Sequence, residues 1–110
     1  MTQAIPSLSG EACVPAARAL SEDGIATLLS RIDGWSREKG AIRKDFRFDD
    51  FHRTMAFVNA VAWIAHRADH HPDLDVGYGH CAVTWSTHSA GGLTRNDFVC
   101  AARTDDLLRA

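Results

Sequence analysis

Histidine is unevenly distributed along this chain of 110 residues, which contains six histidines. His66, His70 and His71 lie close together near the end of one segment with helical periodicity. His88 follows a segment of alternating apolar and polar residues that is able to run back towards them. Because imidazole has an unperturbed pKa of about 6.5, it donates and accepts protons near neutral pH. The cluster therefore suits general acid–base chemistry or metal binding.

Spacing alone leaves more than one interpretation of this cluster open. His66 and His70 are four residues apart, as in helical zinc sites of the HxxxH type. However, no glutamate directly follows His66 to act as a base, and nothing in the spacing requires a third ligand. Cationic histidines are also favoured at a helix C-terminus by the helix dipole alone. Catalysis, metal binding and helix capping all remain possible at this point.

Three segments have the periodicity of amphipathic helices. The first, about 21–32, opens with a serine cap and two acidic residues. A long central helix starts at Asp49 or Asp50 and stops near Asp69, because Pro72 cannot continue it. Its apolar stripe is predicted to consist of Phe51, Met55, Val58, Ala62 and Ala65.

The third helix begins after Thr94, and Asp97 occupies the acidic position of a capping box. We prefer this structural role for Asp97, although its carboxylate could instead orient or charge a histidine. Pro72 is expected to end the central helix and direct the histidine pair rather than to contact a ligand. Trp63 and Trp85 could stack on a flat ring, but aromatic residues at such positions more often belong to the core.

Alternating segments indicate four strands between these helices. A hairpin is predicted from 35–38 and 41–48, with its turn at residues 39–40. A short strand near 76–78 precedes a longer strand that ends at His88. The order α-β-β-α-β-β-α, with one apolar face on each strand, predicts an α+β fold of two layers. Helices should cover one face of an antiparallel, four-stranded sheet.

The composition argues for one domain that binds neither nucleic acid nor membranes. Hydrophobic residues make up 45% of the chain, too few for two separate cores. The net charge of −2 provides no broad positive field for phosphate backbones. No stretch approaches the roughly 20 apolar residues of a membrane span. Residues 1–18 lack periodicity and are predicted to form a flexible arm, followed by a domain at 19–110.

The cysteines bear on the compartment. The three cysteines are widely spaced and form neither a CxxC pair nor a disulfide framework. Such cysteines suit a reducing environment, and the start of the chain does not resemble an export signal. A cytoplasmic location is therefore expected.

The residues around the histidines make the pattern more specific. Residues 46–51 read FRFDDF, and residues 87–94 read THSAGGLT. The signature itself consists of His66-x-x-x-His70-His71-Pro72, followed by Tyr78, His88 and Asp97. It resembles that of the pterin-4a-carbinolamine dehydratase family, also known as the dimerisation cofactor of a homeodomain transcription factor. The resemblance covers about 20–108 and implies the same α-β-β-α-β-β-α order.

The resemblance implies a site and a reaction. A 4a-hydroxytetrahydropterin would be the substrate, and it would lose water to give a quinonoid dihydropterin without a metal or cofactor. His70 and His88 would act as acids on opposite faces of the ring, while His71 would position the substrate. The supporting residues would be Asp97, His66 and Pro72.

His66 departs from the pattern, because many members of the family carry an acid at this position. A carboxylate would raise the pKa of a neighbouring imidazole, whereas a protonated histidine would lower it. Activity is expected to survive, with a pH optimum shifted in a direction that the sequence does not decide.

The resemblance also implies partners. Dimers would form through the sheet and pair into tetramers, and an aromatic amino acid hydroxylase would generate the substrate during tetrahydrobiopterin recycling. The alternative is a non-catalytic binding or assembly module of the same fold. Degenerate relatives of that kind tend to lose the histidines, and all three principal histidines are present here.

Overall fold

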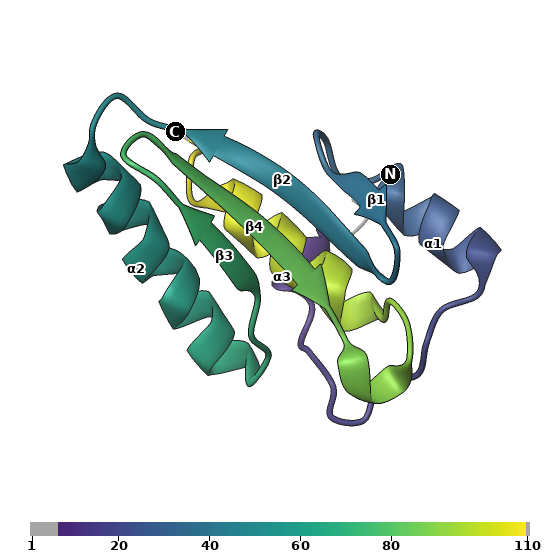
Figure 1. Ribbon diagram of the computed structural model, residues 1–110. Coiled ribbons are helices and arrows are strands. Elements are labelled where there is room, and N and C mark those ends of the chain that lie inside the picture. Colours follow the sequence, from purple (N-terminus) through teal and green to yellow (C-terminus); the bar gives the residue numbers. More distant parts are fainter. Residues whose placement is uncertain (1–6, 110) are drawn as a thin grey trace, which may run out of the picture.

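The computed structural model describes residues 7–109, which form two layers (Figure 1). The strands are β1 (Ser36–Glu38), β2 (Ala41–Arg47), β3 (Asp73–Val76) and β4 (His80–Ser86). The helices are α1 (Glu22–Leu29), α2 (Phe51–Ala68) and α3 (Arg95–Asp106), with 3-10 helices η1 (Leu8–Gly10) and η2 (His88–Ala90). No described helix is long and apolar enough to cross a membrane.

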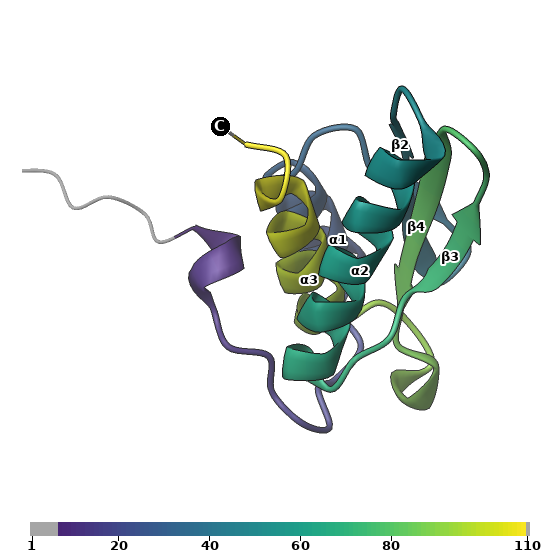
Figure 2. The same cartoon turned by 90° about the vertical axis from the view of Figure 1, so that its left-hand side faces the viewer.

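The sheet has four strands in the order β1-β2-β4-β3, and every neighbouring pair is antiparallel. The three helices lie on one face of it (Figure 2). The predicted α+β architecture is therefore confirmed. The central pair, β2 and β4, sets Ile42 opposite Trp85 and Phe46 opposite Cys81. These four side chains point to the helical layer and are buried, as strand alternation requires.

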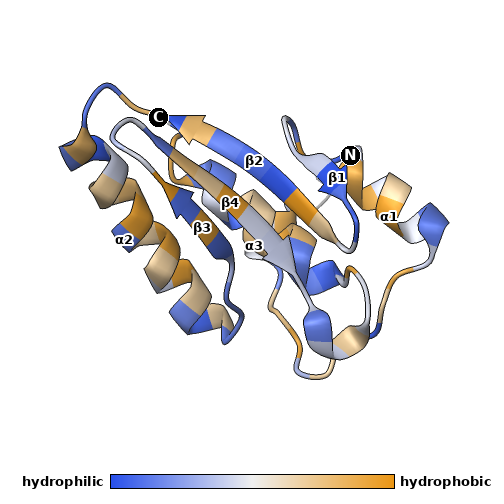
Figure 3. Ribbon diagram, viewed as in Figure 1, coloured by the Kyte–Doolittle hydropathy of each residue, from blue (hydrophilic) through white to orange (hydrophobic). Residues whose placement is uncertain are grey.

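The core lies between these two strands and the helices. Trp85, Ile42 and Phe98 of α3 have no exposed surface. Phe57 of α2 packs against Phe46, with ring centroids 4.7 Å apart. Arg43, Asp45 and Arg47 lie on outward positions of β2, and the middle of this strand is coloured as hydrophilic between two apolar stretches (Figure 3). Strand alternation thus fixes which face of the sheet receives the helices.

The buried stripe of α2 differs from the predicted one. It consists of Thr54, Phe57, Val61 and Ala65. Phe51, a member of the predicted stripe, is 50% exposed. The helix carries apolar residues around most of its circumference, so its periodicity does not single out one face. Thr54 can be buried because its hydroxyl donates to the carbonyl oxygens of Asp50 and Tyr78, both at 2.9 Å.

Two predicted boundaries are wrong by a few residues. The first helix ends at Leu29, although Ile32 is still buried beyond it. The third strand ends at Val76 rather than extending to Tyr78, because residues 77–79 form the turn to β4. In that turn, Gly79 approaches the backbone so closely that a Cβ would lie 2.8 Å from the carbonyl oxygen of Phe48.

Residues 7–17, within the segment that we predicted to be an arm, lie along α3. Leu8 in η1 is only 4% exposed and belongs to the main apolar cluster. Arg103 of α3 donates to the backbone carbonyls of Ser9 and Glu11. Residues 1–6 of the predicted arm lie outside the described residues, and the division of the chain into arm and domain stays a prediction.

Replacing Leu8 with alanine is expected to lower the free energy of unfolding by about 2–5 kcal/mol, the usual cost of emptying a buried leucine site. Urea denaturation followed by tryptophan fluorescence would measure the change. Leu108→Ala is the matched control, since Leu108 is 54% exposed. Equal changes in both variants would show that η1 does not contribute to the core.

Candidate active site

The end of α2 determines where His70 and His71 lie. The helix ends at Ala68, and Asp69 adopts the left-handed conformation with φ of 51°. The N–H of Asp69 donates to the carbonyl of His66 (3.3 Å), and that of His70 to the carbonyl of Ala65 (3.1 Å). This pairing is typical of a Schellman motif. His70 therefore leaves the helical path.

His66 consequently does not share a helical face with His70. Its side chain is exposed and stacks on Trp63, with ring centroids 5.5 Å apart. The HxxxH interpretation required both histidines on one continuous helix, which the left-handed residue prevents. Among residues 7–109, no group of three or more His, Cys, Asp or Glu side chains has an arrangement able to hold a metal ion.

His70 is held on two sides. Its Nε2 lies 2.6 Å from Oδ1 of Asp97, and its ring stacks on Trp85 at 5.6 Å with an interplanar angle of 15°. The His70 side chain is 14% exposed, and that of Asp97 is fully buried. A ring with a carboxylate at its edge and an indole against its face has little freedom to rotate. His70 is therefore preorganised, with a small part of its surface open to solvent.

Asp97 also caps the N-terminus of α3. Its Oδ2 accepts hydrogen bonds from the hydroxyl of Thr87 (2.8 Å) and from the backbone N–H of Thr94 (2.9 Å), the N-cap residue. The predicted capping role is confirmed. Because Asp97 acts as an acceptor, Nε2 of His70 must donate to Oδ1, which leaves Nδ1 for proton exchange. The same carboxylate fixes the orientation of the His70 ring.

The three principal histidines surround one pocket. A hollow of about 290 Å³ is lined by Asp69, His70, His71, Asp73, Ser86, Thr87, His88 and Ser89. His71 and His88 are exposed. His88 opens η2 rather than ending the strand as predicted, and its Nε2 lies 3.4 Å from Oγ of Ser86. The loop after α2 and the loop after β4 thus bring the predicted acid–base groups together.

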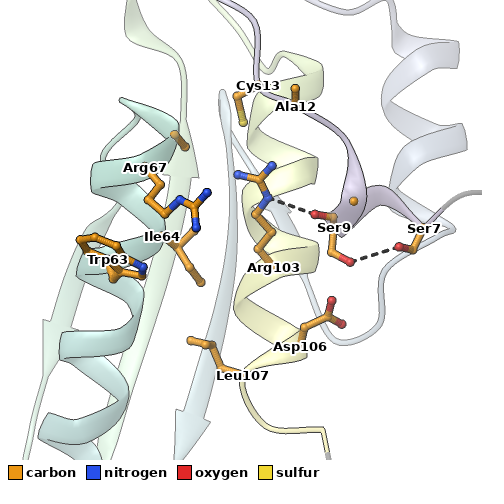
Figure 4. A pocket seen from close by; sticks show the side chains of 12 residues that line it. Ser7, Ser9, Ala12, Cys13, Trp63, Ile64, Arg67, Arg103, Asp106 and Leu107 are labelled. Atoms are coloured by element: carbon orange, nitrogen blue, oxygen red, sulfur yellow. Dashed lines mark hydrogen bonds between the residues drawn. The ribbon is translucent and has the colours of Figure 1, made fainter.

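The remaining sequence candidates lie outside this pocket. Pro72 is half-buried directly before β3, next to the histidine pair but not lining the hollow. Trp85 is buried, so the core interpretation is right for it, and it contacts His70 instead of a ligand. Trp63 is 60% exposed, so the core interpretation is wrong for it. It lines a separate hollow of about 620 Å³ between α2, α3 and residues 7–13 (Figure 4).

Sequence reasoning did not select Thr87 as a site residue. Its hydroxyl donates to Asp97 and lies 3.0 Å from that of Thr94, so it completes the shell around the carboxylate. The sequence did contain a signal, because Thr87 follows Cys81, Val83 and Trp85 at alternate positions on the same face. A polar residue at the end of an apolar face is a candidate for holding a neighbouring site residue.

The chain is similar to proteins of one family. The sequence model of the family described as pterin 4 alpha carbinolamine dehydratase matches residues 18–107. A protein of Nitrosospira multiformis is 48% identical over 99% of both chains. A protein of Stenotrophomonas maltophilia is 51% identical over 97% of this chain and 96% of its own. The names of both relatives assign the pterin-4-alpha-carbinolamine dehydratase activity provisionally.

Solved structures show the same fold. A transcriptional coactivator/pterin dehydratase from Brucella melitensis superposes with a TM-score of 0.80 and 31% identity, over 84% of this chain and all of that chain. A pterin dehydratase-like protein described as a RuBisCO assembly factor in the alpha-carboxysome has a TM-score of 0.56 and 24% identity, over 66% and 84% of the chains. At that identity the second likeness concerns the fold alone. With its sequence match, its close relatives and its fold, this chain belongs to the pterin 4 alpha carbinolamine dehydratase family.

Proposed function

We propose that this protein dehydrates a 4a-hydroxytetrahydropterin to a quinonoid dihydropterin by histidine acid–base catalysis, as a step of tetrahydrobiopterin recycling. The family supports a pterin-4a-carbinolamine dehydratase. The observation that carries the mechanism is the pair of His70 and Asp97 at the edge of a pocket that also contains His71 and His88.

The reaction needs a proton at the departing oxygen. Loss of hydroxide from C4a is slow at neutral pH, whereas a positioned imidazolium can protonate the hydroxyl as the C4a–O bond breaks. The lone pair of N5 then forms the double bond to C4a, water leaves, and the proton on N5 passes to a base. The sum is one pterin and one water from one hydroxypterin, with no change of oxidation state.

We assign the acids to His70 and His88 and the positioning of the ring to His71. His70 has a carboxylate partner, Asp97, which orients its ring for proton donation. His88 lies on the loop after β4, whereas His70 and His71 lie on the loop after α2. Proton donors on two different loops could serve the two faces of a flat ring.

The wider setting is part of the same proposal. We propose a cytoplasmic homodimer or homotetramer, without direct contacts to nucleic acid, that receives its substrate from an aromatic amino acid hydroxylase. The strand β3 lies at one edge of the sheet, with one side paired to β4. A sheet edge of this kind can pair with a second copy.

The test is the absorbance change as an enzymatically generated 4a-hydroxytetrahydropterin loses water. Purified protein in chelator-treated buffer is expected to accelerate the spontaneous reaction, and added Zn²⁺ is expected to leave the rate unchanged. No acceleration with or without Zn²⁺ would favour a binding or assembly role. Acceleration that requires Zn²⁺ would contradict the proposed mechanism.

A further inference from the structure

A second hollow adjoins the histidine pocket. Its volume is about 440 Å³, and residues 13–17 form one of its sides. It shares Asp69, His70, Thr87 and Ser89 with the histidine pocket. The two hollows therefore meet at His70, and a molecule in contact with His70 has room to extend from one into the other.

Residues 13–17 are held in place by α3. Asn96 binds Val14 twice, since its Oδ1 accepts from the backbone N–H (3.0 Å) and its Nδ2 donates to the carbonyl (2.7 Å). Arg95 forms two bonds of 2.7 Å with the carboxylate of Glu11. These bonds and the charge of Arg95 lower the pKa of the Glu11 carboxyl. This anchor is therefore present at neutral pH and is lost as Glu11 protonates in acid.

The backbone conformation at this hollow is unusual. Among residues 7–109, two residues other than glycine have positive φ, Ala16 with 53° and Asp69 with 51°. Both line the second hollow, one from each side. The conformation of Asp69 belongs to the Schellman motif that ends α2, whereas that of Ala16 costs of order 1–3 kcal/mol and indicates a backbone held by its surroundings. Residues 13–17, opposite Asp69, thus have a defined backbone conformation.

The side chains suit a short, partly polar group. Val14, Pro15, Ala16 and Ala17 present aliphatic surface, whereas His70, Thr87 and Ser89 present polar groups on the other side. In a 4a-hydroxypterin, N5 alone separates C4a from C6, so the substituent at C6 lies next to the reacting centre. A ring with its C4a hydroxyl near His70 would direct that substituent towards one of the adjoining spaces.

We propose that residues 13–17 form a specificity wall for the C6 substituent of the pterin, and that this wall favours a short hydroxylated alkyl chain over a bare methyl group. The alkyl carbons would contact the aliphatic side, and the hydroxyls would face Thr87 and Ser89. The inference rests on the proposed function for the identity of the ring. It adds a site element that precedes residues 18–107, the part matched by the family.

Ala17→Leu tests the wall by filling the hollow. Kinetics would be compared for two 4a-hydroxytetrahydropterins, one with a dihydroxypropyl group at C6 and one with a methyl group. The variant is expected to raise KM for the first by about tenfold or more, with a change of less than about twofold for the second. Ala12→Leu is the matched control, because Ala12 is exposed on the same segment and does not line this hollow.

Equal changes for both substrates, or none for either, would overturn the wall. If the wild type accelerated neither reaction, the proposed function would fail, and a binding experiment would still test whether residues 13–17 contact the substituent.

Cys13 lines the hollow and is partly accessible, whereas burial raises the pKa of the Cys81 thiol to about 11 and also raises that of Cys100. Alkylation at neutral pH should therefore reach Cys13 first.

Mass spectrometry would follow this alkylation in the presence of 7,8-dihydropterins, which have no 4a-hydroxyl group and therefore cannot be dehydrated. The dihydroxypropyl compound is expected to slow modification of Cys13 more than the 6-methyl compound does. Cys13→Ser should lack the fast modification altogether. Equal protection by both compounds, or protection by neither, would place the substituent elsewhere and contradict the wall.

Discussion

Replacing His70 with alanine is expected to lower kcat for pterin dehydration by about 100-fold or more, the range in which a positioned general acid contributes. The variant removes the proton donor that Asp97 holds at 2.6 Å, while the pocket and the other two histidines remain. Single-turnover absorbance measurements, corrected for the spontaneous reaction, would give the loss. His88→Ala is expected to show a loss of similar kind, since both are assigned as acids.

His52→Ala is the matched control for both substitutions. His52 is exposed in the first turn of α2 and does not line the pocket. Its removal should leave kcat unchanged. Thermal unfolding of each variant would separate catalysis from packing, because His70 also stacks on Trp85. A His70→Ala protein with wild-type kcat would refute the assignment of the acid.

The second large effect is expected at Asp97, where alanine and asparagine should behave differently. Asp97→Ala leaves three donors, on His70, Thr87 and Thr94, without their acceptor. Loss of a cap together with unsatisfied buried donors should lower the free energy of unfolding by about 2–4 kcal/mol. Urea denaturation would measure this loss.

Asp97→Asn should keep more of the stability and still lose activity. The amide oxygen can continue to accept from Thr94, which turns the amide NH₂ group towards His70. His70 would then carry its proton on Nδ1, the wrong tautomer, and the imidazolium would lose its carboxylate partner. By analogy with such pairs in other enzymes, kcat should fall by about 100-fold or more, with a smaller effect on KM.

Asp106→Asn is a suitable control for Asp97→Asn, since Asp106 is exposed on the same helix. If Asp97→Asn lowered the midpoint of thermal unfolding and left kcat intact, the carboxylate would serve the helix alone. That outcome would support the interpretation that Asp97 only caps α3. Loss of kcat with a nearly unchanged midpoint would assign Asp97 as a positioning residue of His70.

Strand alternation and helix signals predicted the architecture because they depend on local chemistry. Cys81, Val83 and Trp85 share the inward face of β4, so their burial follows from the pleat. The buried face of α2 could not be predicted in the same way. Which side of a largely apolar helix meets the sheet depends on contacts with β2 and the β3–β4 turn, including the bond from Thr54 to the carbonyl of Tyr78.

The candidate site was likewise predictable only where it depends on local sequence. Clustering and family resemblance selected the histidines, and the structure gathers His70, His71 and His88 at one pocket. The separation of His70 from the helical face of His66 depends on a single left-handed residue, Asp69, whose conformation has no clear signature in sequence. Contacts made by residues 7–17 are likewise tertiary, and two of them link positions 82 and 94 residues apart in the chain.

One carboxylate group both starts α3 and holds His70. During evolution, selection for a folded chain alone would therefore retain this aspartate, even after the enzyme activity had been lost. Its presence in a homologue gives no information about turnover. The histidine at position 70 does not cap the helix. A relative that keeps the aspartate but has replaced this histidine is therefore expected to descend from an enzyme that has lost its activity.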